Sequence, residues 1–415
     1  MKIVFINKYE STGGAAIAAL RLADGLEEYY KTKNHFVVGV KSSNTTNVYE
    51  SVPKGLLQII ERGCSFLMSM AGLQYVFIPF STKTIFRTIQ QLKPDIISIH
   101  NIHGAYFQTN LLQKLSSIAP IVWTLHDMWA FTANAAYTYG NDAWKYMESF
   151  SGERALFPPI GLPTGKWLLR RKQKIYQKSR ITFVTPSAWL YGCAAQSPAL
   201  GGKKILHINN GIDTAQYSPL EKKELRQTFN IPTSDPVVLF SAEKILSAGR
   251  KGGSLFLHIL EELNNTTKRK IHIVLVGKGR MSDFSRFQNF VVHPTGYIHD
   301  EQMMIRLINL ADVLLFPSKA DNLPNVLLEV IACGVPAVTF DIGGCKEIIR
   351  DGENGYVVKA FDTKTFAEKT LYLLEHPDVL QSFSKEGREI AEKEFSLRHM
   401  ARQYYNLFQE IVPQP

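Results

Sequence analysis

The segment DNLPNVLLEVIACGVPAVTF combines acidic side chains with the signals for the start of a helix. Asp321 and Glu329 stand eight positions apart. Asn322 is a residue type that caps helices and Pro324 suits a first turn, so we expect a helix that starts here and ends at Gly334. The amino end of a helix attracts anions because its first amides are unpaired. A nucleotide sugar fits this arrangement, with its diphosphate at the amides and its hydroxyl groups at the carboxylates. An ordinary turn with solvated acids is the alternative.

Two cations flanked by glycines occupy Gly249–Gly253, between an expected strand and an expected helix. Arg250 and Lys251 can neutralise the charge that develops on a departing diphosphate. No cluster of metal ligands accompanies these loops in the sequence, so we expect side chains and helix ends, not a divalent ion, to supply that charge. Further candidates at strand ends, where a base can stack or meet backbone amides, are Gly277, Tyr297 and Ile298.

The first half of the chain offers a glycine loop and a histidine at a strand end. Gly13 and Gly14 precede an expected helix, where a phosphate can approach the backbone closely. The full G-x-G-x-x-G pattern is missing, which argues against a nicotinamide cofactor. His126 follows a buried strand and has Asp127 beside it, so it can touch a substrate hydroxyl or phosphate. A structural histidine in a loop is the alternative.

These loops are positioned by alternating strands and helices, which predict an α/β fold with parallel, doubly wound sheets. The pattern stops near Asn209–Asp213 and then restarts, and 415 residues exceed one typical core. We therefore expect two facing Rossmann-like domains, residues 1–212 and 213–396, with a central cleft. Ligands of such sheets bind at the carboxyl ends of the strands. A last helix is expected within residues 397–415, packing back on the first domain.

Composition places the protein in a general class. Hydrophobic residues make up 45% and charged residues 20% of the chain, as in soluble globular proteins. Its four cysteines are scattered, without the spacing of a zinc site or a disulfide framework. The amino terminus reads as a strand and not as a signal peptide, and no apolar run reaches the roughly 20 residues of a membrane span. We therefore expect a cytoplasmic protein.

The net charge of +10 requires an anionic partner. Seven of the cations fall between Lys166 and Arg180, a segment without an acid. No nucleic-acid-binding pattern accompanies them, so an anionic membrane surface or a diphosphate-bearing lipid fits better. The apolar stretch Gly55–Tyr75 could dock beside them on the inner face of the cell membrane. Core packing of that stretch and a solvated basic helix are the alternatives.

Several motifs together resemble the retaining family-4 glycosyltransferases of the bipartite GT-B fold, in particular bacterial capsule, exopolysaccharide and colanic-acid-type enzymes. The resemblance spans essentially the whole chain. It rests on STGGAAIAALRLADGL at Ser11–Leu26, WTLHDMWAFT at Trp123–Thr132, TPSAWL at Thr185–Leu190, INNGIDTAQYSP at Ile208–Pro219, GRKGG at Gly249–Gly253 and DNLPNVLLEVIACGVPAVTFDIGGCKEII at Asp321–Ile349.

The resemblance implies a role for each candidate. Lys251, with Arg250, would bind the donor diphosphate and aid its departure. Asp321 would contact the donor sugar and Glu329 the ribose, while the amides of Leu323 and Asn325, on either side of Pro324, would meet sugar and phosphate. His126 would lie near the transferring sugar, and Gly14 would line the diphosphate side. The catalytic set is therefore His126, Lys251 and Asp321, and Gly13 and Asn322 complete the donor-binding set.

The resemblance further implies transfer of a sugar from a nucleotide diphosphate to a lipid-linked glycan, with retained configuration and without a metal or another cofactor. Surface polysaccharides such as capsule, exopolysaccharide or lipopolysaccharide would be the products. His103, Asp127 and Trp129 would meet the acceptor. After Thr132 the sequence departs from the family pattern, because Ala133–Tyr137 replaces a glycine-containing start and no cysteines follow; this concerns the acceptor and not the donor.

Other classes share the architecture. A nucleotide-sugar epimerase would turn over its donor without a glycan. An oxidoreductase would require the complete glycine pattern. A sugar-binding scaffold without activity would be expected to lack the charged loop residues, all of which are present here.

Overall fold

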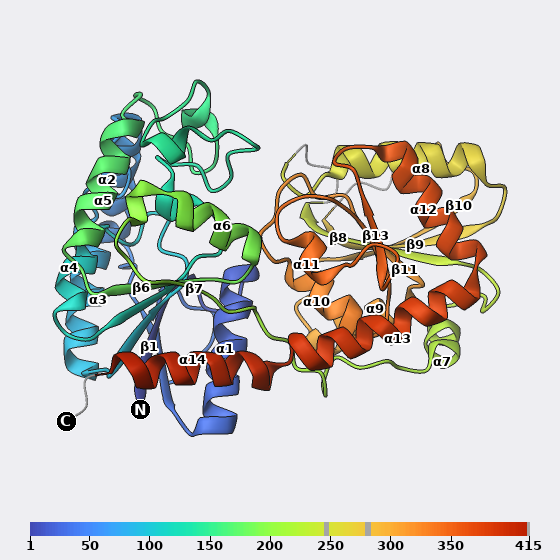
Figure 1. Ribbon diagram of the computed structural model, residues 1–415, viewed down its shortest axis with the longest axis horizontal. Coiled ribbons are helices and arrows are strands. Elements are labelled where there is room, and N and C mark those ends of the chain that lie inside the picture. Colours follow the sequence, from blue (N-terminus) through green and yellow to red (C-terminus); the bar gives the residue numbers. More distant parts are fainter. Residues whose placement is uncertain (245–248, 279–283, 413–415) are drawn as a thin grey trace. The chain divides into compact units, whose positions relative to one another are not determined.

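The computed structural model describes residues 1–244, 249–278 and 284–412 of the chain, which divides into two compact units (Figure 1). Unit 1 contains Met1–Gly211 and Met400–Pro415, and unit 2 contains Ile212–His399. The sequence places this boundary one residue later, after residue 212. The end of the last predicted helix, residues 413–415, lies outside the described residues.

In the described part of unit 1, seven parallel strands form one sheet in the order β3-β2-β1-β4-β5-β6-β7. The strands are β1 Lys2–Tyr9, β2 Lys33–Val40, β3 Val48–Glu50, β4 Ile96–Ile99, β5 Ile121–Thr124, β6 Ile181–Thr185 and β7 Ile205–His207. The helices are α1 Gly14–Tyr30, α2 Leu56–Met70, α3 Pro79–Leu92, α4 Leu111–Ser116, α5 Gly165–Gln177, α6 Ala188–Gln196 and the returning part of α14 Leu397–Ile411. Short 3-10 helices are η1 Trp129–Phe131, η2 Ala143–Tyr146, η3 Glu153–Ala155 and η4 Pro198–Leu200.

Unit 2 repeats this plan with six described parallel strands in the order β10-β9-β8-β11-β12-β13. The strands are β8 Val237–Lys244, β9 Ile271–Lys278, β10 Phe290–Gly296, β11 Val313–Phe316, β12 Ala337–Phe340 and β13 Gly355–Val358. The helices are α7 Lys222–Thr228, α8 Gly253–Thr266, α9 Glu301–Leu310, α10 Asn325–Ala332, α11 Cys345–Ile348, α12 Thr363–Glu375 and α13 Pro377–Glu394. The predicted fold class, two parallel-sheet α/β domains, is confirmed.

Both sheets are covered on both faces, which explains their almost continuous apolar strands. Along β8, Val237 and Leu239 join one apolar cluster, while Val238 and Phe240 join the other. This alternation follows from the two-residue period of a strand. In each sheet the connections change direction once, between β1 and β4 in unit 1 and between β8 and β11 in unit 2. Such switch points open a crevice at the carboxyl ends of the strands, where ligands of this fold class bind.

The last helix, α14, belongs to unit 1 from Met400 onward. Tyr404 is buried, and its hydroxyl pairs with Thr124 Oγ1 of β5 at 2.8 Å. The ring of Tyr405 stacks on Tyr30 of α1 with a centroid separation of 4.0 Å. The carboxyl-terminal segment is therefore an integral part of the first unit.

One segment differs from the sequence-based expectation, and a second is not packed in the core. The helix expected to start at Asn322 begins at Asn325, with Pro324 as its cap residue. The apolar stretch Gly55–Tyr75 contains α2, whose apolar side chains are mostly exposed and whose single buried residue is Glu61. Within the described residues, no helix combines the length and the hydropathy needed to cross a bilayer.

Candidate active site

The switch point of unit 2 brings together the predicted donor-binding cations and carboxylate. Arg250 and Lys251 precede α8, and Asp321 follows β11, the strand that pairs with β8. Gly252, the cap residue of α8, makes this possible because a Cβ on it would lie only 1.8 Å from the carbonyl oxygen of Pro317. The close approach of the two loops is stabilised by the Lys319 amide, which donates to the Arg250 carbonyl at 2.7 Å.

Asp321 receives both cations on one carboxylate oxygen. Its Oδ2 lies 2.7 Å from Lys251 Nζ and 2.8 Å from a terminal nitrogen of Arg250. Its Oδ1 accepts from the amide of Asn322 at 3.1 Å. Burial favours the neutral acid, but Arg250 and Lys251 outweigh it and hold the pKa of Asp321 below its usual range. The cluster therefore carries one net positive charge beside the amino ends of α8 and α10.

The remaining residues of this motif surround the cluster. Asn322 accepts from the amide of Gly344 through its carbonyl at 2.9 Å and lies before the helix, so its predicted role as the cap is wrong. Leu323 and Pro324 are buried, and Asn325 is the first residue of α10. Glu329 is buried about one turn into α10, and not two turns as a start at Asn322 implies. Gly334 follows the helix with a positive φ of 67°, in agreement with the predicted end.

The other donor-binding candidates lie on the β9–β10 side of the same sheet. Gly277 is buried near the end of β9. Tyr297 is exposed and its ring lies 4.7 Å from that of His299, while Ile298 packs on the core. In the described part of the chain, no hydrogen bond or ion pair joins these three residues to Asp321. Their contact with a base stays a prediction.

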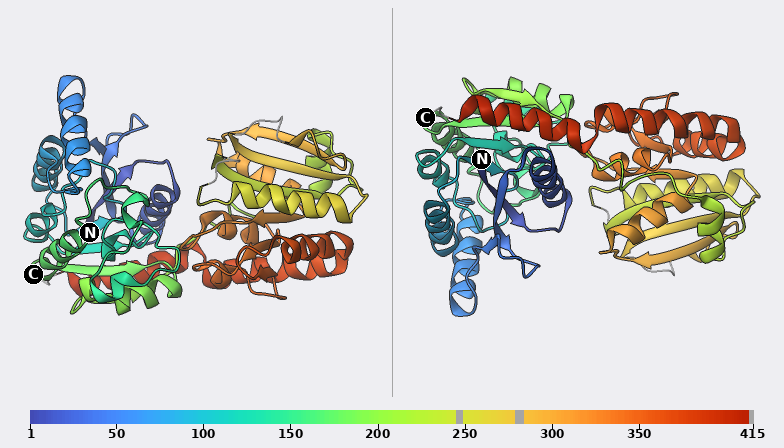
Figure 2. Two further views of the ribbon diagram at one scale, coloured as in Figure 1. Left: turned by 90° about the horizontal axis from the view of Figure 1, so that it is seen from above. Right: turned by 90° about the horizontal axis from the view of Figure 1, so that it is seen from below.

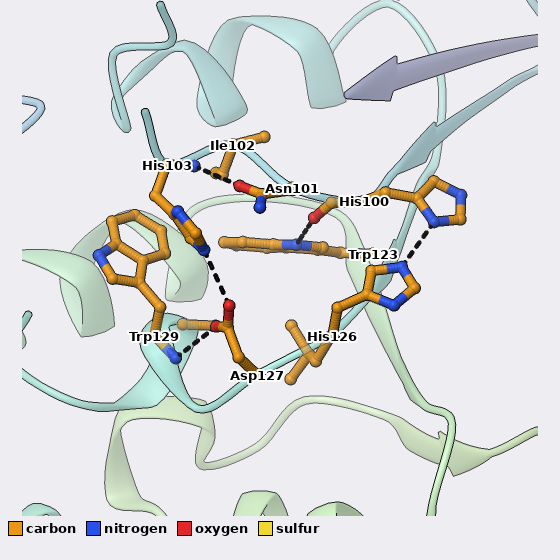
Figure 3. Close-up of a pocket in the computed structure, with 10 residues that line it drawn as sticks. His100, Asn101, Ile102, His103, Trp123, His126, Asp127 and Trp129 are labelled. Atoms are coloured by element: carbon orange, nitrogen blue, oxygen red, sulfur yellow. Dashed lines mark hydrogen bonds and ion pairs between the residues drawn. The ribbon is translucent and has the colours of Figure 1, made fainter. Parts of the chain in front are cut away.

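In unit 1, the candidates follow the strands on both sides of its switch point. Gly13 and Gly14 are exposed at the amino end of α1, after β1. His126 and Asp127 follow β5, and His103 lies in the loop after β4 (Figure 3). The strands β4 and β5 are paired neighbours, so these loops meet at one edge of the sheet.

The histidines belong to two separate hydrogen-bonded pairs, one of two histidines and one of a histidine with an aspartate (Figure 3). His126 Nε2 lies 2.9 Å from Nδ1 of His100, whose Nε2 lies 3.3 Å from Ser98 Oγ. His103 Nε2 lies 2.8 Å from Asp127 Oδ2, and Asp127 Oδ1 accepts from the amide of Trp129 at 2.9 Å. The hydrogen bond within each pair fixes the orientation of its rings, so His100 fixes the orientation of the His126 ring.

Burial determines the charge of the first pair. Desolvation lowers the pKa of His126 to about 4, although Asp127 opposes this shift. Desolvation also lowers the pKa of His100 well below its usual value. Both imidazoles are therefore neutral at physiological pH. The pKa of Asp127 is lowered despite its burial, because His103 and the Trp129 amide stabilise its charged form.

Trp129 is a packing residue in this structure. Its side chain is only 2% exposed and lies beside Tyr75, Trp123 and His103. The ammonium group of Lys172 on α5 lies 3.6 Å from the centroid of its indole and donates to the Trp129 carbonyl at 2.5 Å. Lys172 is itself buried, so the basic segment Lys166–Arg180 is not a uniformly exposed surface. Contact of Trp129 with an acceptor stays a prediction.

Sequence reasoning did not select His100, although the signal was present. His100 directly follows the last residue of β4, and His126 follows β5 with one residue between them. The His100 carbonyl also accepts from the indole of Trp123 at 2.9 Å, which anchors the loop (Figure 3). The role of His100 in supporting His126 depends on the spacing of neighbouring strands, which the sequence alone does not give.

Comparisons with known proteins agree with this architecture. A model described as Glycosyltransferase Family 4 matches residues 12–216, and a model described as Glycosyl transferases group 1 matches residues 235–376. The chain is 23% identical to the protein named "Putative colanic acid biosynthesis glycosyl transferase WcaC" of Escherichia coli (strain K12), over 99% of this chain and all of that one.

Solved structures show the same fold. The UDP-glucose complex of Alr3699/HepE from Anabaena has a TM-score of 0.70 at 16% identity, with 99% of this chain and 100% of that chain covered. WaaG, a glycosyltransferase involved in lipopolysaccharide biosynthesis, has a TM-score of 0.66 at 14% identity, with both chains fully covered. With matching models in both halves and a GT-B fold, the chain belongs to the family-4 and group-1 glycosyltransferases.

Proposed function

We propose that this glycosyltransferase moves a sugar from a nucleotide diphosphate to a lipid-linked glycan, in the synthesis of a bacterial surface polysaccharide. The observation that carries the proposal is the cluster of Arg250, Lys251 and Asp321 at the switch point of unit 2. Its net positive charge suits a diphosphate. The relatives support the product class, since WcaC is named for colanic acid and WaaG for lipopolysaccharide biosynthesis.

In the proposed reaction, Lys251 and Arg250 exchange part of their interaction with Asp321 for the diphosphate oxygens. As the bond between the sugar and the diphosphate breaks, negative charge grows on the leaving group, and preplaced cations stabilise that state most. Asp321 then accepts hydrogen bonds from the sugar, and Glu329 from the ribose. Because the cluster supplies positive charge itself, the proposal includes no metal ion.

His126 is the residue of unit 1 to which the proposal assigns a role at the transferring sugar. A neutral imidazole can accept or donate a hydrogen bond to a sugar hydroxyl without bringing a charge near the cationic centre that forms at C1. The acceptor hydroxyl would attack on the face from which the diphosphate leaves, with retention of configuration. Determination of the anomeric configuration of the product by NMR tests this step.

A thermal-shift panel of UDP-, GDP- and ADP-sugars tests the donor. We expect one nucleotide class to raise the melting temperature, and Glu329→Ala to abolish most of that rise. Transfer should continue in excess EDTA. No shift with any donor, together with no sugar transfer to a lipid-linked acceptor, would contradict the proposal, and donor turnover that needs no acceptor would indicate an epimerase.

Binding to an anionic membrane surface is part of the proposal, and the structure of α2 supports it. Seven apolar side chains of this helix are between 43% and 71% exposed: Leu56, Leu57, Ile59, Ile60, Phe66, Leu67 and Met70. The helix is held to unit 1 by a polar anchor, because the Glu61 carboxylate accepts from the amides of Phe80 and Ser81 at 2.7 and 2.8 Å. Both views of Figure 2 show α2 projecting beyond the other elements of unit 1.

Cations accompany this apolar surface. Arg62 on α2 and Lys166 and Arg170 on α5 are exposed, and the carbonyl groups at the end of α2 accept from Gly161 and Leu162 in the segment that leads to α5. An apolar helix face with nearby cations is typical of interfacial binding to anionic lipid. We expect flotation with phosphatidylglycerol vesicles but not with phosphatidylcholine vesicles, and loss of flotation in Phe66→Glu. Phe361→Glu changes an exposed phenylalanine of unit 2 and is the control. Equal flotation of the wild-type protein with both kinds of vesicle would contradict this part of the proposal.

A further inference from the structure

Lys8 is a cation of unit 1 to which neither the sequence motifs nor the proposed reaction assigns a role. It lies near the carboxyl end of β1, at the switch point between β1 and β4. Its side chain passes between Gly39 of β2 and Gly104 in the loop after β4. A Cβ on Gly39 would lie 3.0 Å from Lys8 Cδ, and one on Gly104 would lie 3.1 Å from the same atom. The stem is therefore held in a slot that larger residues would close.

Among the described residues, the ammonium group at the end of this stem has aromatic but no acidic neighbours in contact. Its Nζ lies 5.1 Å from the ring centroid of Tyr106 and 5.8 Å from that of Tyr9. Within the part of the chain that the structure describes, no hydrogen bond or ion pair joins Lys8 to another residue. Glu61 is the acid that faces it, but that carboxylate is engaged by Phe80 and Ser81 at the start of α3.

A second cation, Arg62 of α2, faces the same group. Burial and the charge of Arg62 together lower the pKa of Lys8 to about 8, although Glu61 opposes them. A half-buried ammonium group without a counter-ion is costly for a folded protein. An anionic ligand beside the ammonium group of Lys8 would compensate for this cost.

The surroundings indicate what kind of anion fits. Asn7, which precedes Lys8, accepts through its side chain from the amide of Asn101, and Asn101 in turn accepts from the amide of His103. The residue before Lys8 is thus hydrogen-bonded to the loop that holds His103, a predicted acceptor residue. Arg62 lies on α2 between the exposed apolar residues Ile59 and Phe66. An anion that carries a hydrocarbon chain matches both the cations and the apolar helix.

We propose that Lys8, with Arg62, binds the phosphate or diphosphate group of the lipid that carries the acceptor glycan, and that α2 contacts its hydrocarbon chain. This inference rests on the proposed function and adds the chemical class of the acceptor anchor. Bilayer phospholipids and the donor also carry phosphate groups. Lys8, however, lies in a slot at the carboxyl end of β1, and this position favours a single acceptor molecule over a bilayer surface. The donor diphosphate has its own cations in Lys251 and Arg250.

The test compares the wild-type protein with Lys8→Met, which keeps an unbranched stem and removes the charge. Binding is measured to farnesyl diphosphate, to farnesol, to phosphatidylglycerol vesicles and to the donor identified by the thermal-shift panel. We expect Lys8→Met to weaken farnesyl diphosphate binding by about tenfold or more, as for a lost charged contact, and to leave the other three unchanged. Lys33→Met, an exposed lysine at the opposite, amino end of β2, should bind all four as the wild type does.

Each other outcome overturns the inference. Unchanged farnesyl diphosphate binding in a Lys8→Met protein with the wild-type melting temperature would show that Lys8 does not bind the anchor. An equal loss of vesicle binding would assign Lys8 to bilayer headgroups, and a loss of donor binding would assign it to the donor. If Lys8→Met lowers the melting temperature, Lys8→Gln is measured in its place, with the same expectations. Donor-dependent sugar transfer by the wild type is measured in parallel, so that failure of the proposed function is recognised separately.

Discussion

The switch points of the two units have the same topology but present different groups at the predicted sugar contacts. In unit 2, two cations and one carboxylate converge within 2.8 Å, and the carboxylate stays charged although it is buried. In unit 1, the residue predicted to meet the transferring sugar is a neutral imidazole, supported by a second neutral imidazole. The Asp321 cluster of unit 2 is therefore suited to a charged group, and the His126–His100 pair of unit 1 to a hydroxyl group.

The difference shows how one fold can divide the work of a transfer reaction. Charge on a departing diphosphate requires opposite charge that is already in place, because reorganisation during the reaction would cost energy. A sugar hydroxyl requires only an oriented hydrogen-bonding partner. The following experiments test whether the two crevices differ in this way.

Removal of Lys251 should have the largest effect. In the proposed reaction, Lys251→Ala removes a preplaced cation that would stabilise the leaving diphosphate, so we expect kcat to fall by about 10²- to 10³-fold. Steady-state transfer assays measure this. Lys393→Ala removes an exposed lysine on α13 that pairs with Glu389 at 2.9 Å, and it should leave kcat unchanged. A fall of less than threefold in Lys251→Ala would contradict the assignment of charge stabilisation to unit 2.

Acid should destabilise unit 1 through its neutral histidines. An unfolded histidine titrates near pH 6.5, whereas the pKa of His126 is about 4 in the folded protein. Between these values only the unfolded state binds the proton, so the stability is complete above pH 6.5 and decreases as the pH falls towards 4. We expect a loss on the order of 2 kcal/mol between pH 7 and pH 5 from His126 alone.

Tryptophan fluorescence isolates this effect, because all five tryptophans lie in unit 1, between Trp123 and Trp189. The denaturant midpoint of the fluorescence transition should be lower at pH 5 than at pH 7. The difference should be smaller in His126→Gln, which has no ring to protonate. Equal midpoints in the wild type at both pH values would contradict a buried neutral pair.

Loss of the imidazole of His126 should reduce transfer less than loss of Lys251. His126→Ala removes the proposed hydrogen bond to an uncharged sugar hydroxyl, so we expect about a tenfold fall in kcat/KM. His207→Ala, at the exposed end of β7, is the control. A loss as large as that of Lys251→Ala would indicate that unit 1 also stabilises charge, and the contrast between the crevices would fail.

The smallest effect is expected for the affinity of the free nucleotide. In Asp321→Asn, Lys251 and Arg250 no longer pair with a carboxylate, so we expect UDP, or the diphosphate of whichever donor binds, to bind a few-fold more tightly while transfer is slower. Isothermal titration calorimetry measures the dissociation constant. Glu389→Gln removes the carboxylate of a surface pair and should change neither quantity. Weaker binding of the diphosphate in Asp321→Asn would show that Asp321 does not compete for the cations.

Much of this contrast could be predicted from the sequence, because it rests on local patterns. Strand and helix periods predicted two doubly wound sheets, and the glycines around Arg250 and Lys251 indicated a charged loop between a strand and a helix. The pairing of these cations with Asp321 could not be predicted, because it depends on the contact of loops that are 70 residues apart. For α2 the sequence left two alternatives, docking on a membrane and core packing, since an apolar period is the same whether the helix packs on a core or projects from it.

The cap of α10 was predicted two residues too early, because Asn322 and Pro324 are both favourable at helix starts and propensity alone does not choose between them. The tertiary contact of the Asn322 carbonyl with Gly344 decides in favour of Pro324. The support of His126 by His100 was missed for a related reason, since neighbouring strands set that distance.

The return of α14 to unit 1 has a consequence for biosynthesis. Tyr404 fills a buried position against β5, yet it leaves the ribosome after all of residues 212–399. At about 5–20 residues per second, translation of that segment takes on the order of ten to forty seconds. During this interval all strands of the first sheet have been synthesised, but the helix α14 has not. The part of the sheet that α14 covers therefore stays exposed while the second unit is translated.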